Sequence, residues 1–234
     1  MFALLTIVLI GGIGVAGACA IDRRSRRWRG VLLLLMAPLV LLLLIQPAQP
    51  AAARSYPKLF GTFELPSTNM KKFPKWTSML KRWKDGAPCN GATCSTKGWN
   101  ELIARLKGKD LKTQLKEVNR EMNLHPYILD INNWGQEDYW ATPFEFLKKS
   151  GDCEDFAISK YMALKALGVP IADMRVVALR DLNLGIGHAI LVVYVDNVPM
   201  VLDNQIGTVV PASSIKHYQP VYSINEQKWW LHTR

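Results

Sequence analysis

A cysteine, a histidine and an aspartate occupy positions from which they could cooperate in nucleophilic catalysis. Cys153 lies in the stretch 150–157, which predicts a tight turn followed by the first turn of a helix. His188 stands at the start of a β-branched run, and Asp203 stands at the end of the next run. A thiol nucleophile needs a base that takes its proton, and the base needs a third group that fixes its orientation. These three residues supply the parts in chain order.

Local signals predict the helix that carries Cys153. Asp152 can cap its start, and apolar residues recur at helical spacing until Gly168-Val169-Pro170 ends the pattern. The free N–H groups and the positive end of the helix dipole would favour a thiolate there. A second interpretation is that Asp152, Glu154 and Asp155 are merely acids suited to a helix start, and that Cys153 is a small buried hydrophobe.

Strands must position the other two residues. The runs 175–179, 189–195 and 200–203 predict strands, and Asp196-Asn197 predicts a hairpin turn between the last two. Antiparallel pairing would then place His188 beside Asp203. Individually, the histidine could be a strand-end surface residue and the aspartate a turn residue. The remaining histidines are predicted to lie on the surface: His125, His217 and His232.

Helices precede this sheet in the chain, which indicates an α+β fold. Helical spacing is found over 76–83, 99–106 and 110–122, and Thr142-Pro143-Phe144-Glu145 is typical of a capping box. Tryptophans of the first helix are expected in the core. Residues 132–135 predict a turn. Cys89 and Cys94 flank a loop and could form a small disulfide, two free thiols or a metal pair.

The first 54 residues predict a targeting region, and residues 55–234 predict one catalytic-size domain. The net charge of the 234 residues is +10, and half of it lies in residues 1–54, which disfavours nucleic-acid binding. A basic block at 23–29, an apolar run at 31–45 and Ala51-Ala52-Ala53 are typical of a secretory signal peptide, with cleavage near Ala53.

Other interpretations of this region stay open. Residues 2–21 could be a first membrane span, or could follow a start codon assigned too early, and an uncleaved N-terminus would anchor the protein in the membrane. The catalytic domain begins with a cluster of cations that predicts a solvated face, or a patch for an acidic partner or for the membrane surface: Lys71, Lys72, Lys75, Lys81, Arg82 and Lys84.

Four motifs carry a resemblance to a known family: Asp138-Tyr139-Trp140-Ala141-Thr142-Pro143-Phe144-Glu145-Phe146-Leu147, Gly151-Asp152-Cys153-Glu154-Asp155-Phe156-Ala157-Ile158-Ser159-Lys160-Tyr161, Gly187-His188-Ala189 and Val201-Leu202-Asp203-Asn204. Together they resemble the bacterial transglutaminase-like cysteine proteinases, and within that family the LapG-type periplasmic proteases that cleave surface adhesins. The resemblance extends over most of residues 56–230. It leaves out the first 54 residues.

The resemblance implies a papain-like, transglutaminase-like core with Cys153 as nucleophile, His188 as general base and acid, and Asp203 as its orienting group. It also implies a calcium cofactor held by Asp152 and Glu154, with Asp155 as a further ligand. Carboxylates beside a thiol oppose thiolate formation, so a cation that neutralises them would relieve the conflict. The oxyanion hole is expected to include the N–H of Cys153, with the Trp140 indole as one candidate for a second donor.

The function implied by the resemblance is that of a periplasmic, calcium-dependent cysteine endopeptidase. It would cleave the N-terminal region of a large repeat adhesin, release the adhesin from the cell and so control biofilm attachment. Its regulatory partner would be an inner-membrane cyclic-di-GMP receptor, and the lysine and tryptophan surface of residues 71–84 is a candidate contact. Two alternatives are a protein-glutamine transglutaminase that uses the same three residues and a non-catalytic calcium-binding module.

Overall fold

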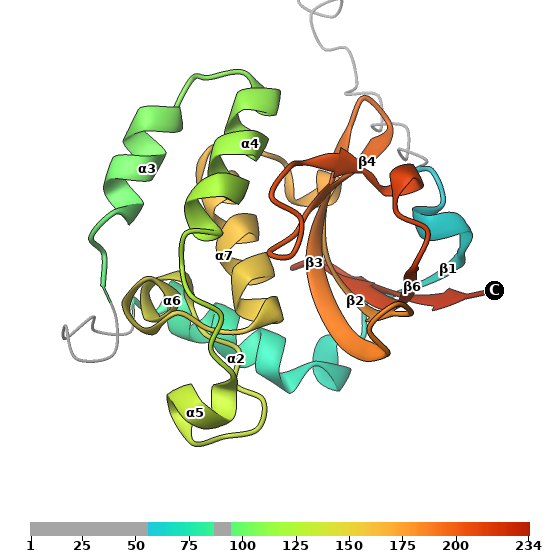
Figure 1. The fold of residues 1–234 in the computed structure, drawn as a ribbon, viewed down its shortest axis with the longest axis horizontal. Helices are drawn as coiled ribbons and strands as arrows, with labels where there is room; N and C mark the ends of the chain where they lie inside the picture. The colour runs from blue at the N-terminus through green and yellow to red at the C-terminus, as the bar shows by residue number, and fades with distance from the viewer. Residues whose placement is uncertain (1–55, 87–94) are drawn as a thin grey trace, which may run out of the picture. The chain divides into compact units, whose positions relative to one another are not determined.

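The helices of the computed structural model gather on one side of a single sheet (Figure 1). The structure describes residues 56–86 and 95–234, so the N-terminal targeting region and the pair Cys89 and Cys94 lie outside the described residues. No helix in these two ranges is long and apolar enough to cross a membrane. The helices are α2 (Pro74–Lys84), α3 (Trp99–Leu106), α4 (Leu111–Met122), α5 (Asp130–Trp134), α6 (Pro143–Lys149) and α7 (Cys153–Ala166).

The seven strands of the sheet are antiparallel throughout and follow the order β1-β7-β6-β2-β3-β4-β5. The α+β prediction is confirmed, although one strand precedes the helices and pairs with the last strand of the chain. The strands are β1 (Phe63–Ser67), β2 (Met174–Asp181), β3 (Ile186–Val195), β4 (Val198–Leu202), β5 (Val210–Pro211), β6 (Tyr218–Ile224) and β7 (Trp229–Thr233).

The hairpin between β3 and β4 is confirmed, with Leu191 opposite Leu202 and Val195 opposite Val198. Asp196 and Asn197 form its two-residue turn, and both have positive φ angles, of 49° and 63°. Such a turn matches the twist of the strands, and Asp and Asn tolerate the left-handed region better than other non-glycine residues. Local turn chemistry therefore sets the register of this strand pair.

Most other predicted elements are also present. Asp110 caps α4 by accepting a hydrogen bond from the Thr113 N–H at 3.0 Å, and Thr142 and Glu145 form the predicted capping box of α6. The predicted turn at 132–135 is wrong in type. Its first three residues belong to α5, which ends at Trp134, and Gly135 follows in the left-handed conformation.

Two apolar clusters fill the two faces of the sheet. One lies between the helices and the sheet, and α7 runs through it, packed between α4 and β3 (Figure 1). The other covers the opposite face and includes the alternating residues Ile190, Val192 and Tyr194 of β3. Trp76 of α2 is fully buried in the first cluster, and Trp83 packs against Trp99, as predicted for a core helix.

Candidate active site

Cys153 is the first residue of α7, as the sequence predicts. The chain enters the helix through Ser150, which has a positive φ of 62°, and through Gly151. A Cβ atom on this glycine would lie 2.7 Å from the Cβ of Asp155, so only glycine fits there without a shift. The fold therefore packs the entry turn directly against a carboxylate of the first helical turn.

The predicted capping role of the Asp152 side chain is wrong. This residue occupies the N-cap position, but its main-chain oxygen, not its carboxylate, accepts the hydrogen bonds from the N–H groups of Asp155 and Phe156. Its Oδ1 atom is buried and has no hydrogen-bond partner in the described part of the chain. This oxygen is thus left available for another ligand.

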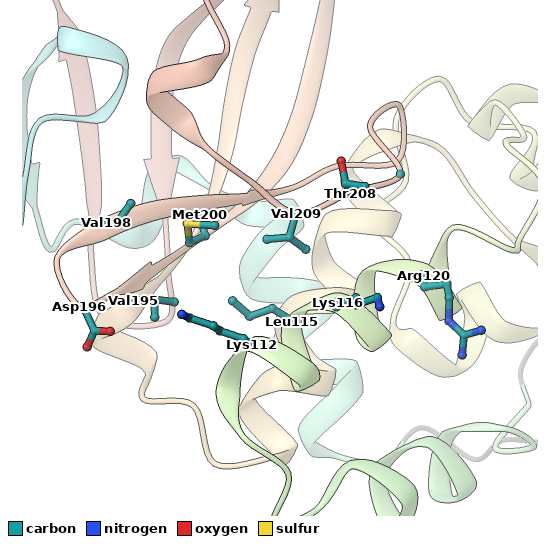
Figure 2. A pocket seen from close by; sticks show the side chains of 11 residues that line it. Lys112, Leu115, Lys116, Arg120, Val195, Asp196, Val198, Met200, Thr208 and Val209 are labelled. Carbon is teal, nitrogen blue, oxygen red and sulfur yellow. The ribbon is translucent and has the colours of Figure 1, made fainter.

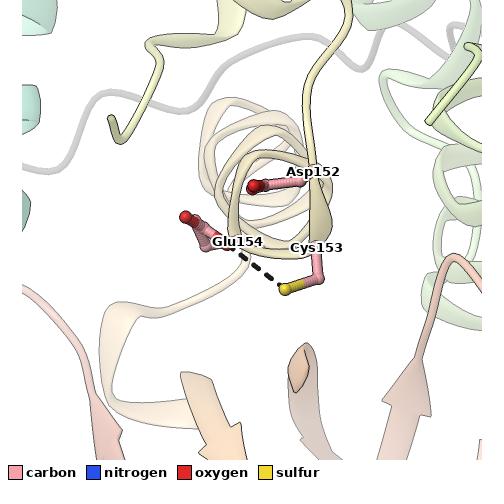
Figure 3. A group of neighbouring side chains, drawn as sticks. All are labelled: Asp152, Cys153 and Glu154. Atoms are coloured by element: carbon pink, nitrogen blue, oxygen red, sulfur yellow. Dashed lines mark hydrogen bonds between the residues drawn. The ribbon is translucent and has the colours of Figure 1, made fainter. Parts of the chain in front are cut away.

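The thiol of Cys153 points along the first turn and donates a hydrogen bond to Oε2 of Glu154 at 3.2 Å (Figure 3). Burial, and then the charge of Glu154, raises the pKa of this thiol above its usual range. The N–H of Ala189 acts in the opposite direction, and this residue directly follows His188 on β3. Within the described ranges no hydrogen bond joins Cys153 to His188.

His188 and Asp203 lie side by side, as the hairpin predicts. The Nε2 atom of the histidine is 2.9 Å from Oδ1 of Asp203, and both side chains are almost fully buried. A carboxylate acceptor favours the tautomer with its proton on Nε2, which leaves Nδ1 as the proton-accepting nitrogen. A buried imidazole held in this way can act as a general base.

Three further residues hold Asp203 in place. Tyr218 of β6 donates its hydroxyl to Oδ2 at 2.6 Å, the N–H of Gln205 donates to Oδ1 at 2.9 Å, and Asn123 donates to the main-chain oxygen of Asp203 at 2.8 Å. Burial would raise the pKa of Asp203, but hydrogen bonds from His188, Tyr218 and Gln205 outweigh it and lower the pKa. Sequence reasoning missed Tyr218, because no local pattern relates it to Asp203.

The acids around Cys153 form a group larger than the sequence predicts. Asp152 and Asp155 lie close to Asp130 at the start of α5, with one carboxylate oxygen from each within 4.8 Å of the others. Glu154 makes a second such group with Asp130 and Asp138. Asp152, Glu154 and Asp155 are the ligands predicted from the sequence. No local pattern predicts Asp130 and Asp138, which lie in α5 and just after it, 14 or more positions upstream.

Residues 83–233 match the model of a protein family described as the bacterial transglutaminase-like cysteine proteinases. The matched segment contains the helix of Cys153, the strand of His188 and the residue Asp203 that follows β4. The chain belongs to this cysteine proteinase family. A comparison with curated proteins found no match.

Solved structures of this proteinase family also resemble the chain. Legionella pneumophila LapG is 39% identical over 57% of this chain and 75% of its own, with a TM-score of 0.52. Its calcium-bound form gives the same identity and coverage with a TM-score of 0.53. Its EGTA-treated form is 38% identical over 58% of this chain and 75% of its own, with a TM-score of 0.54. The transglutaminase-like fold predicted from the sequence is thereby confirmed.

The acid group of this proteinase suits a hard divalent cation. Asp130, Asp152 and Asp155 each contribute one buried carboxylate oxygen that has no hydrogen-bond partner among the described residues. Burial raises the pKa of Asp130 to about 6, and burial together with Asp152 raises the pKa of Glu154 to about 9. Crowded carboxylate oxygens that lack donors are costly unless protons or a metal neutralise them, and oxygen ligands are those that calcium prefers.

Other predicted site residues fall elsewhere in the proteinase. Trp140 packs edge to face on Trp76 and contacts the apolar core, which supports a structural role. His125 and His217 are half-buried. The surface prediction is wrong for His232, which is buried between Thr62, at 2.8 Å, and Ser223, at 2.9 Å, because β1 covers β7 on that side.

The basic face at 71–84 is only partly as predicted. Its lysines are exposed, so a charged partner could reach them. Trp76 is fully buried and is not part of that surface, whereas Trp83 is half-buried and packs on Phe144 at 4.7 Å between ring centres.

Proposed function

We propose that the protein is a calcium-dependent cysteine endopeptidase in which Cys153 is the nucleophile, His188 the general base and acid, and Asp203 the group that orients the imidazole. The observation that carries the proposal is the buried pair of His188 and Asp203, in which His188 directly precedes Ala189, the residue whose N–H acts on the thiol. The proteinase family of the chain supports a peptidase over the two alternative functions.

The proposed reaction begins with proton transfer from the Cys153 thiol to Nδ1 of His188. The thiolate attacks the carbonyl carbon of the scissile peptide bond, and the Cys153 N–H at the start of α7 stabilises the oxyanion. The imidazolium then protonates the leaving amine, which gives a thioester. Water, deprotonated by the same imidazole, attacks the thioester carbonyl, and the released thiolate recovers a proton. Asp203 holds the ring through Nε2 throughout.

Calcium is proposed as the cofactor, held by Asp130, Asp152, Glu154 and Asp155, with Asp138 at the edge of the group. Partnerless carboxylate oxygens in this chain support it, as does the existence of calcium-bound Legionella LapG. A bound cation would neutralise the carboxylates beside Cys153 and so lower the cost of forming the thiolate. The Cys153 thiol donates a hydrogen bond to Glu154, one of these carboxylates.

The proposed substrate and setting follow from the similarity to LapG. The substrate is the N-terminal region of a large surface adhesin, and cleavage in the periplasm releases the adhesin from the cell and controls biofilm attachment. An inner-membrane cyclic-di-GMP receptor is the proposed regulatory partner, with the exposed lysines of residues 71–84 as its contact. Charge reversal of Lys81 and Lys84 should weaken receptor binding. Unchanged binding would remove this surface from the proposal.

The first test is cleavage of a candidate adhesin N-terminal fragment by the purified protein, with calcium, with EGTA and with Cys153→Ser. Two fragments that appear only with calcium and the intact thiol are expected. Crosslinked products that retain both chains would indicate transglutamination. Absence of cleavage, together with a thiol that resists alkylation in calcium, would favour the non-catalytic module.

Substitutions of acids inside and outside the carboxylate group test the role of calcium separately from the role of Cys153. Asp152→Asn and Glu154→Gln should abolish cleavage and calcium binding together, whereas Glu137→Gln should change neither, because this exposed acid is outside both carboxylate groups. Cleavage that persists in EGTA would support the peptidase activity and exclude a requirement for calcium.

A further inference from the structure

A groove of about 600 Å³ lies between α4 and the β3–β4 hairpin (Figure 2). Its volume is that of a site for one small organic molecule. Val195, on its wall, is seven residues from His188 along β3, which corresponds to about 23 Å. The groove is therefore a separate feature from the site of Cys153 and its neighbours.

The two walls of the groove differ in chemistry (Figure 2). The hairpin and the segment that follows β4 contribute apolar side chains, and Leu115 of α4 extends this surface. The helix also contributes Lys112, Lys116 and Arg120, which are spaced by four residues and so share one face of α4. One acid, Asp196, lies at the hairpin end. The apolar wall consists of Val195, Val198, Met200 and Val209.

Two of the three cations are available for a ligand. Lys112 and Lys116 are exposed and form no ion pair within the described residues, whereas Arg120 pairs with Glu117 at 2.7 Å. Long cationic side chains can lie along apolar surface and still present their charged ends at its rim. The groove thus combines an apolar interior with a rim that attracts a negative charge at one side.

We propose that this groove binds one single-chain anionic amphiphile, with its hydrocarbon chain on Val195, Met200 and Val209 and its carboxylate on Lys112 and Lys116. Charge complementarity selects the anionic head, and the apolar wall selects the chain. A peptide is disfavoured because its backbone N–H and C=O groups would enter an apolar wall without partners, at a cost in free energy that a hydrocarbon chain does not incur.

The same helix also holds the loop that carries Asp203. Asn119 of α4 donates to the main-chain oxygens of Ile206 and Gly207, at 3.3 and 3.1 Å, and Asn123 donates to that of Asp203 at 2.8 Å. A ligand in the groove would contact the end of this loop at Gly207 to Val209. We therefore expect occupancy of the groove to slow amide hydrogen exchange in residues 203–209.

The test uses dodecanoate as the probe, titrated by calorimetry into the full chain below the micelle concentration of the probe. One saturable site is expected. Dodecyltrimethylammonium has the same chain length and the opposite head charge, so it should bind about tenfold more weakly or less. Acetate, which has the head without the chain, should not bind. Equal affinity for the two amphiphiles, or no saturable dodecanoate site, would overturn the proposal.

A pair of charge-reversal variants locates the site. Lys112→Glu combined with Lys116→Glu should weaken dodecanoate binding about tenfold or more. The matched control is Lys107→Glu combined with Lys148→Glu, which makes the same change in net charge at exposed residues that do not line the groove. Equal weakening by both variants would show a general charge effect and contradict the proposal.

Two further outcomes would assign the groove to another occupant or to none. Sedimentation that shows self-association, lost in the Lys112 and Lys116 variant only, would make the groove a contact between copies of this chain. Dodecanoate binding that leaves hydrogen exchange at 203–209 unchanged and is insensitive to Val198→Gln would place the ligand elsewhere. Catalytic activity is not the readout, so the result is independent of the proposed peptidase function.

Discussion

Asp203 shows how single residues set the chemistry of the site. It is 1% exposed, and a carboxylate at such a position is stable as an anion only when donors surround it. His188, Tyr218 and the Gln205 N–H provide three of them. These donors hold Asp203 in place, and Asp203 in turn orients the imidazole of His188. Loss of one donor should therefore slow the reaction by letting the imidazole ring leave its productive orientation.

Tyr218→Phe tests this positioning role. The change removes one hydrogen bond to a charged group, which is worth about 1.5–3 kcal/mol, so kcat should fall about tenfold to a hundredfold with little change in KM. The measurement is a full kinetic comparison with Tyr194→Phe on β3, a buried tyrosine whose hydroxyl has no hydrogen-bond partner among the described residues. Equal effects of the two substitutions would show that the Tyr218 hydroxyl contributes only to general stability.

Lys160 gives a prediction of pH dependence. It is fully buried in α7, its Nζ atom has no hydrogen-bond partner among the described residues, and burial lowers its pKa from 10.5 to about 7, against the opposing charge of Asp203. Above pH 10.5 the amine is neutral in both the folded and the unfolded state, so there is no free-energy cost of burying a charge. As the pH falls from 10.5 to 7 the unfolded chain gains a proton that the folded chain does not, so stability falls.

Lys160→Met should remove that pH dependence. At pH 7 the variant should exceed the wild type in free energy of unfolding by about 3–5 kcal/mol, and the difference should shrink as the pH approaches 10. Urea unfolding of both proteins at pH 7, 8.5 and 10 measures it, and the subtraction cancels contributions from other titrating groups. A difference that is constant with pH would show that packing, not charge burial, dominates at this position.

At the scale of elements, the entry turn of α7 couples the nucleophile to the carboxylate group. The turn holds Ser150 at a positive φ of 62° and brings Gly151 against Asp155, whose Oδ1 accepts a hydrogen bond from the Ala141 N–H at 2.7 Å. This contact joins α7 to the segment before α6. A shift of the turn would therefore move Cys153 and the carboxylates together.

Gly151→Ala should be damaging for that reason. The new methyl group would meet the Asp155 side chain, and relieving the overlap should cost about 1–3 kcal/mol of stability and most of the activity. Gly187→Ala is the matched control, since a Cβ there has no atom within 4 Å and the residue adjoins His188. Thermal unfolding and cleavage assays compare the two. If the two substitutions had equally small effects, the entry turn of α7 would be able to accommodate the methyl group without displacing Cys153.

At the scale of the whole domain, the first and last described strands close the sheet at one edge. β1 pairs with β7, and Glu64 of β1 forms a 2.5 Å ion pair with Arg175 of β2, which stacks on Trp230 at 3.7 Å. Arg175 is 2% exposed. Removing one partner of a buried ion pair leaves the other charge uncompensated, which costs far more than losing a surface pair.

Glu64→Gln should accordingly cost about 3–5 kcal/mol in the free energy of unfolding. Glu121→Gln removes an exposed ion pair with Arg105 and should cost less than about 1 kcal/mol. Urea unfolding at neutral pH measures both. Similar costs would indicate that water or another group compensates Arg175 when its carboxylate partner is lost.

Calcium should stabilise the whole domain if the carboxylate group is its site. A ligand that binds only the folded state at a hundred times its Kd adds about 2.7 kcal/mol, so the Tm should rise by several degrees with calcium and return with EGTA. Asp155→Asn should abolish most of the rise, and Glu137→Gln should keep it. A Tm that does not respond to calcium in the wild type would contradict the assigned site.

Local sequence signals predicted the parts of the site that depend on neighbouring residues. The start of α7 at Cys153 follows from a turn and helical spacing, and the pairing of His188 with Asp203 follows from a two-residue turn at Asp196-Asn197. These interactions span 15 residues or fewer, and the period of a helix or the register of a hairpin is enough to place them.

Tertiary structure alone decided the parts that come from distant segments. Asp130 and Asp138 join the acids of α7 because α5 and the segment before α6 pack against its first turn, and Tyr218 reaches Asp203 because β6 crosses to the far side of β2. No period in a sequence encodes such contacts, since they depend on how helices and strands pack once formed. The sequence thus determined which residues could do the chemistry, and the packing of the fold decided which others support them.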